Sequence, residues 1–162
     1  MKKYKLNKGQ SMFEVLVAIF IISLITVGVI VVSTNSVSNS SFSRNSTLAG
    51  RYAQEAIEWL RDEEATDTTV FKNRAPVVGN KYTFCIINLN TAGWLNTGVC
   101  SSGSEYVQNS GQNTIFNREV VLTRQSVSGK TIIEAEVKVY WTDPKGIHEV
   151  KSVTNFSDIR EK

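Results

Sequence analysis

One stretch limits what this chain can fold into more than any other. From Val15 to Val32 there are 18 consecutive residues without a charge, and Glu14 stands directly before them. A run of this length is typical of a helix that spans a bilayer. Four lysines precede the run and none follows it directly, which predicts a cytoplasmic N-terminus and an exported remainder. A carboxylate inside such a segment is costly, so Glu14 needs an explanation.

Two simpler interpretations leave Glu14 unexplained. A cleaved secretory signal has a shorter apolar core and a small-x-small cleavage site, whereas "VVSTNSVS" after this run contains no Ala-x-Ala sequence. A plain signal anchor fits the length of the run, but it gives the carboxylate no role.

The stretch "KGQSMFEVLVAIFIISL" resembles the N-terminal motif of type IV prepilins and of type II secretion pseudopilins. In that family a membrane peptidase cuts after a Gly that ends a short basic leader, the new N-terminus is methylated, and the fifth mature residue is Glu. The resemblance implies a leader over residues 1–9, cleavage between Gly9 and Gln10, N-methylation of Gln10, and Glu14 as the assembly charge. The sequence "EVLVA" resembles minor pilins more than major pilins. The apolar run also lacks the Pro that major pilins usually carry there.

The resemblance also implies a role for Glu14. Cleavage would create an α-amine at Gln10 in the same apolar layer, and a buried carboxylate costs less beside an amine than alone. In a filament the amine of a neighbouring subunit would pair with Glu14 and fix the register. The alternative is that the Glu14 side chain extends to the lipid headgroups.

The resemblance further names partners and a location. It implies a prepilin peptidase, other pilin subunits of a hetero-polymeric filament, an inner-membrane assembly platform, and membrane lipid before assembly. The chain would be a single-pass protein of the cytoplasmic membrane first and part of a cell-surface or extracellular pilus afterwards. Two alternatives stay open, namely a pseudopilin of a type II secretion system and a signal-anchored binding domain that is never polymerised.

The rest of the chain predicts an α+β pilin headpiece. Residues 10–34 form the membrane or filament-core helix, and residues 35–162 form the exported part. Twelve of the fifteen residues over 33–47 are Ser, Thr or Asn, but without Pro or Gly the helix is expected to cross them and to continue as an amphipathic helix over 47–64. An antiparallel sheet is predicted over 81–156. Its expected strands are 81–89, 115–124, 131–141 and 147–156, with a loop over 90–112.

Charge and residue types argue against several classes of function. Without the four leader lysines, 14 basic residues face 15 acidic ones, so nucleic-acid binding is not supported. No catalytic constellation or cofactor motif appears, and the single histidine, His148, is expected to be a solvated strand residue. The acidic run over 61–67 is expected to be the end of a helix and a linker.

The two cysteines, Cys85 and Cys100, follow the apolar run. An exported location favours a disulfide between them, and the alternative is two buried thiols. Zinc needs about four ligands, which one histidine and two cysteines do not supply. Trp94 lies inside the segment that a disulfide would close. It is expected to fill the space beneath this loop, or else to stand out as a contact.

Overall fold

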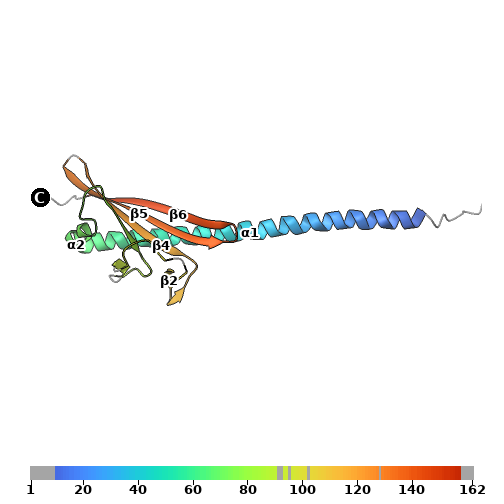
Figure 1. Ribbon diagram of the computed structural model, residues 1–162, viewed down its shortest axis with the longest axis horizontal. Coiled ribbons are helices and arrows are strands. Elements are labelled where there is room, and N and C mark those ends of the chain that lie inside the picture. Colours follow the sequence, from blue (N-terminus) through green and yellow to red (C-terminus); the bar gives the residue numbers. More distant parts are fainter. Residues whose placement is uncertain (1–9, 91–92, 95, 102, 128, 158–162) are drawn as a thin grey trace, which may run out of the picture. The chain divides into compact units, whose positions relative to one another are not determined.

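The computed structural model describes residues 10–90, 93–94, 96–101, 103–127 and 129–157. They form two helices and six strands (Figure 1). The chain divides into two compact units, Met1–Arg44 and Asn45–Lys162, with the boundary inside the first helix. A long N-terminal helix is followed by an antiparallel sheet, which confirms the predicted α+β class. In chain order the elements are α1 (Gln10–Thr66), α2 (Thr68–Asn73), β1 (Lys81–Cys85), β2 (Gln108–Asn109), β3 (Gln112–Asn113), β4 (Asn117–Val127), β5 (Lys130–Asp143) and β6 (Gly146–Ser157).

Helix α1 crosses the Ser/Thr/Asn stretch without a break, as predicted. Residues of these types favour caps and turns through local hydrogen bonds, but they do not stop a helix. Here the Thr34 hydroxyl donates to the carbonyl of Ile30 at 2.7 Å, one turn back on the same helix. The stretch therefore stays helical although its composition resembles that of a linker.

Between Asn45 and its end, α1 is amphipathic. The charged and polar residues of one half, such as Arg51, Glu55 and Glu58, are exposed, and the opposite half is buried or half-buried. The most deeply buried positions are three alanines and Leu60, each at most 1% exposed. They recur every three or four residues, as a helix face requires. The alanines are Ala49, Ala53 and Ala56.

As predicted, the acidic run over 61–67 is the end of a helix, but the expected linker is reduced to the single residue Asp67. Helix α1 continues to Thr66, and Asp67 then caps α2 by accepting a hydrogen bond from the Val70 N–H at 2.9 Å. An Asp in extended conformation before a helix satisfies one of the free N–H groups of the first turn. Phe71 of α2 is buried, which attaches this short helix to the core.

The main sheet has the order β1-β4-β5-β6, and every pair of neighbours is antiparallel. It is the predicted meander. Alternate residues of β5 are buried from Ile133 to Trp141, and the residues between them are half-buried on the other face. The buried face joins the apolar half of α1 in one core.

The segment after β1 differs from the prediction. The strand ends at Cys85 instead of residue 89, although the Ile86 N–H still donates to the Arg118 carbonyl of β4. The Ile87 carbonyl then accepts from Gln108 at the start of β2, so the chain leaves β4 for a new partner. Residues 90–112 are accordingly not all loop, because β2 pairs with β3 across a turn in which Ser110 and Gly111 have positive φ. Such a turn matches the twist of a hairpin.

Candidate functional site

The predicted processing site lies at the start of the described chain. Gly9 is outside the described residues, and Gln10 is the first residue of α1. Cleavage after Gly9, methylation of Gln10 and the role of Glu14 as an assembly charge stay predictions.

The apolar part of α1 is exposed along its whole length. Glu14 and every described side chain from Met12 to Ser36 are exposed, and α1 is long and apolar enough there to cross a membrane. A segment in lipid must satisfy its polar groups internally. The hydroxyls of Ser23 and Thr26 do so by donating to the carbonyls of Phe20 and Ile22 at 2.7 and 2.8 Å. Apart from Glu14, the residues from Met12 to Ser36 carry no charge, which fits a lipid or protein environment around this surface.

The predicted disulfide between Cys85 and Cys100 is present, and it joins the end of β1 to a loop 15 residues later. The loop end is held a second time by Glu119 of β4. Glu119 is 8% exposed, and its carboxylate accepts from the Cys100 N–H at 2.9 Å and from the Tyr140 hydroxyl at 3.0 Å. Burial and the hydrogen bond to Glu119 raise the pKa of Tyr140 well above its usual value, so the phenol keeps the proton that it donates.

Trp94 fills the space beneath the loop, which confirms the first of the two expectations. The residue is 3% exposed, and its ring stacks on Trp59 of α1 and meets Phe84 of β1 edge-on, each with ring centres 5.0 Å apart. The indole N–H donates to Glu63 at 2.9 Å. A Cβ on the neighbouring Gly93 would lie 2.6 Å from the Asn88 carbonyl oxygen. The backbone beside Trp94 can therefore pass this close to Asn88 only with glycine at position 93.

Sequence reasoning missed Arg118, which is the central polar residue of this core. Its side chain is 2% exposed, 3.7 Å from Glu55, and donates to the carbonyls of Ile86 and Tyr52. Burial lowers the pKa of Arg118 to about 10, and Glu55 acts in the opposite direction. The guanidinium thus joins β4, the disulfide loop and α1. The sequence contains a signal for it, because two charged residues, Arg118 and Glu119, directly precede the apolar residues Val120 to Leu122 on one strand.

His148 is a strand residue, as predicted, but it is only partly solvated. It lies on β6 with 23% of its side chain exposed, and its ring centre is 5.3 Å from that of Trp141. Its Nε2 is 3.0 Å from Asp143 Oδ1 across the β5–β6 turn. Because the pair closes a hairpin, its geometry is accounted for by the fold.

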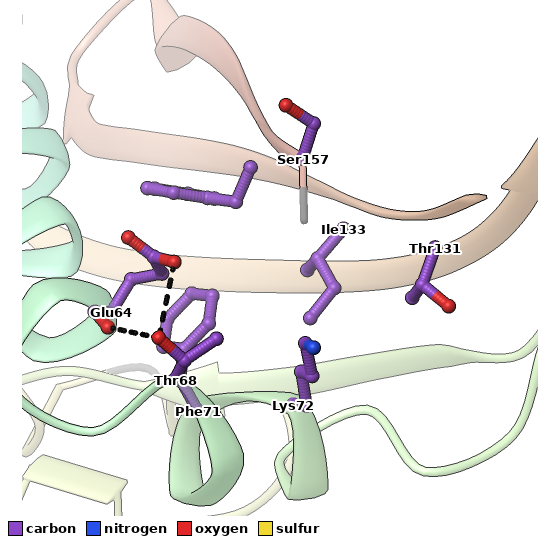
Figure 2. Close-up of a pocket in the computed structure, with 8 residues that line it drawn as sticks. Glu64, Thr68, Phe71, Lys72, Thr131, Ile133 and Ser157 are labelled. Carbon is purple, nitrogen blue, oxygen red and sulfur yellow. Dashed lines mark hydrogen bonds between the residues drawn. The ribbon is translucent and has the colours of Figure 1, made fainter. Parts of the chain in front are cut away.

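Two other features of the described residues fall short of a ligand site. The group of possible metal ligands is Cys85, Cys100 and Glu105, and its two sulfurs are bonded to each other. Figure 2 shows the pocket between α2 and strands β5 and β6, where the Thr68 hydroxyl donates to Glu64. Its volume of about 10 Å³ is that of a single water at most. Neither of these two features therefore supplies a ligand site.

Comparisons with protein-family models, with curated proteins and with solved structures gave no match to this chain.

Proposed function

We propose that this chain is a structural subunit of a type IV pilus or a related filament, similar to a minor pilin. It is made as a membrane-anchored precursor, cut between Gly9 and Gln10, and then built into the filament. One observation carries the proposal, namely that Gly9 precedes Glu14 by five residues directly before an 18-residue uncharged run.

Two structural features support the proposal. The exposed apolar surface of α1 needs lipid before assembly and other subunits afterwards, because water solvates such a surface poorly. The same helix then provides one side of a folded core. A subunit that is drawn from a membrane into a filament needs both properties.

The proposal assigns partners and a location. A prepilin peptidase acts on the cytoplasmic side, and an inner-membrane assembly platform transfers the subunit to other pilins. The protein is a single-pass protein of the cytoplasmic membrane before assembly and is part of a surface filament afterwards.

The test is the intact mass of the chain from cells that hold the matching peptidase. We expect a chain that begins at Gln10 with a methylated amine. Gly9→Leu should keep the whole leader, whereas Gly9→Ala, as the matched control, should retain at least partial cleavage. Wild-type chain that still carries residues 1–9 would instead support the uncut signal-anchored domain. Gene neighbours distinguish the remaining rival, since a secretin without a retraction ATPase favours a secretion pseudopilus.

A further inference from the structure

A cavity of about 450 Å³ opens on the face of the main sheet that points away from the core. Val139 and Trp141 of β5 belong to the core. Tyr140 and Thr142 alternate with them and line the cavity, so they lie on the opposite face. The volume is in the range of about 300–1,000 Å³ that is typical of small-molecule sites. Every described lining residue belongs to the unit Asn45–Lys162, so the cavity forms without a second copy of the chain.

The lining of this cavity combines apolar surface with neutral polar groups. Among the described residues, the aromatic and aliphatic surface comes from Tyr106, Tyr140, Ile115 and Ile147. Ile115 is 51% exposed and Ile147 is 75% exposed, so their apolar surface is open to a ligand. The polar side chains are hydroxyls and one amide, and no described lining residue is an acid or a base. A charged ligand would lose its hydration here without gaining a counter-charge, which favours an uncharged ligand.

Asn117, the first residue of β4, supplies a buried acceptor. It lies opposite Tyr140 in the sheet, lines the cavity and is 5% exposed. Its Nδ2 donates to the Glu105 carbonyl at 2.7 Å, which fixes the orientation of the amide because only its nitrogen can donate. Within the part of the chain that the structure describes, no hydrogen bond reaches its Oδ1. Buried polar atoms are nearly always paired, so this oxygen calls for a donor from a ligand in the cavity.

Two hydroxyl groups complete the polar arrangement. The Thr114 hydroxyl accepts from the Phe116 N–H at 3.2 Å. Among the described residues it donates to no other group, so its proton can be donated to a ligand. The Tyr140 hydroxyl donates to Glu119 at 3.0 Å, which holds the tyrosine ring in place. The cavity therefore offers an acceptor, a donor and a fixed aromatic ring.

We propose that this cavity binds a neutral sugar unit. Each hydroxyl of a sugar both donates and accepts, so one ring can donate to Asn117 Oδ1 and accept from Thr114. The apolar C–H face of the sugar packs on the tyrosine and isoleucine side chains. A wholly apolar ligand would leave the Asn117 oxygen unpaired. The opposing interpretation is that water alone fills the cavity.

The direct test is sugar binding by the full chain in a detergent that has no sugar head group. The probes are glucose, galactose, mannose and N-acetylglucosamine, measured by ligand-observed NMR titration. We expect at least one of them to bind, and the charged sugars glucuronate and glucosamine to bind at least tenfold more weakly. Absence of binding by all four neutral sugars overturns the proposal, and so does equally tight binding of the charged ones.

The methyl glycosides of the same four sugars identify the source of the ligand. Each mimics a sugar at the end of a glycan, because its anomeric oxygen is already substituted. Binding of the methyl glycoside as tightly as the free sugar supports a terminal sugar of a glycan, and binding of the free sugar alone supports a free monosaccharide.

Substitutions test whether binding occurs in this cavity. Asn117→Leu removes the buried acceptor and should weaken binding at least tenfold. Because it also removes the hydrogen bond to Glu105, an exposed position provides a second variant. Ile147→Ser should weaken binding at least threefold, whereas the matched control Val153→Ser, which truncates an exposed side chain of the same strand outside the described lining, should leave it unchanged.

The two exposed variants keep the test decisive even if Asn117→Leu fails to fold. If Ile147→Ser binds the sugar as tightly as the wild type, or if Val153→Ser weakens binding equally, the sugar binds elsewhere and the proposal is wrong. Binding here requires neither cleavage after Gly9 nor assembly, so this failure would leave the proposed function untouched.

Discussion

The two halves of α1 place their apolar side chains in opposite surroundings. In the unit Met1–Arg44 the apolar side chains of the helix are exposed, whereas in Asn45–Lys162 the same helix buries a stripe of alanines and Leu60 under a sheet. Burial of apolar surface stabilises a folded unit only where the chain supplies the covering atoms. The second half therefore contributes to the stability of this protein by itself, and the first half contributes only through a lipid or protein partner.

A substitution at Glu14 tests most directly whether the exposed half of α1 depends on a partner. Glu14→Ala makes the exposed segment more apolar, so membrane insertion and cleavage after Gly9 should persist. On the proposed function, incorporation into filaments should fall, because the amine that cleavage would give a neighbouring Gln10 would lose its counter-charge. The measurement is the ratio of this chain in sheared filaments to that in membranes. An unchanged ratio would show that Glu14 only reaches for the headgroups.

The stability of the unit Asn45–Lys162 should depend strongly on Trp94. Truncation of a buried tryptophan costs about 3–5 kcal/mol, so Trp94→Ala should greatly lower the denaturant midpoint of the full chain in detergent. The matched control Trp94→Phe keeps most ring contacts with Trp59 and Phe84 and loses the hydrogen bond to Glu63. Its loss should be clearly smaller. A Trp94→Ala chain as stable as the wild type would mean that the loop does not depend on this residue.

One substitution made in both halves tests the comparison directly. Leu60→Ala should cost about 2–5 kcal/mol because it opens a cavity in a closed core. Leu24→Ala, which removes the same atoms from the exposed half, should change the free energy of unfolding by less than about 0.5 kcal/mol. Equal effects would mean that the unit Asn45–Lys162 does not unfold independently of the first half.

The sequence predicted some parts of the unit Asn45–Lys162 well and others poorly. Helical periodicity identified the buried stripe, and strict alternation identified β5, because a repeating pattern over many residues reports the face that is covered. The segment after Cys85 was predicted poorly, since its course depends on single contacts such as Gln108 to Ile87. His148 was misjudged for the same reason. Its burial comes from Trp141 and Asp143 on β5, which no local pattern reveals.

The disulfide should also stabilise the unit Asn45–Lys162. Closing a loop of 15 residues contributes about 3 kcal/mol by restricting the unfolded chain. Replacing both cysteines with serine should lower the unfolding midpoint accordingly, while Trp94 still holds the loop to α1. Thiol labelling of the unreduced, denatured wild type checks the premise, and free reaction of both cysteines would contradict it.

The smallest expected effect comes from the Asp143–His148 pair at the β5–β6 turn. Desolvation acts to raise the pKa of Asp143, but hydrogen bonds from His148 and from the Lys145 backbone N–H outweigh it and hold this pKa below its usual value of 3.8. A depressed carboxylate pKa adds stability above the unfolded value, and that stability is lost as the pH falls through the folded value. Asp143→Asn should therefore be less stable than the wild type at pH 6, and the difference should shrink as the pH falls below the usual pKa. Repeating the comparison in a His148→Phe background, which keeps a ring against Trp141, should reduce the difference. A gap that widens toward low pH would show that the pair opposes folding.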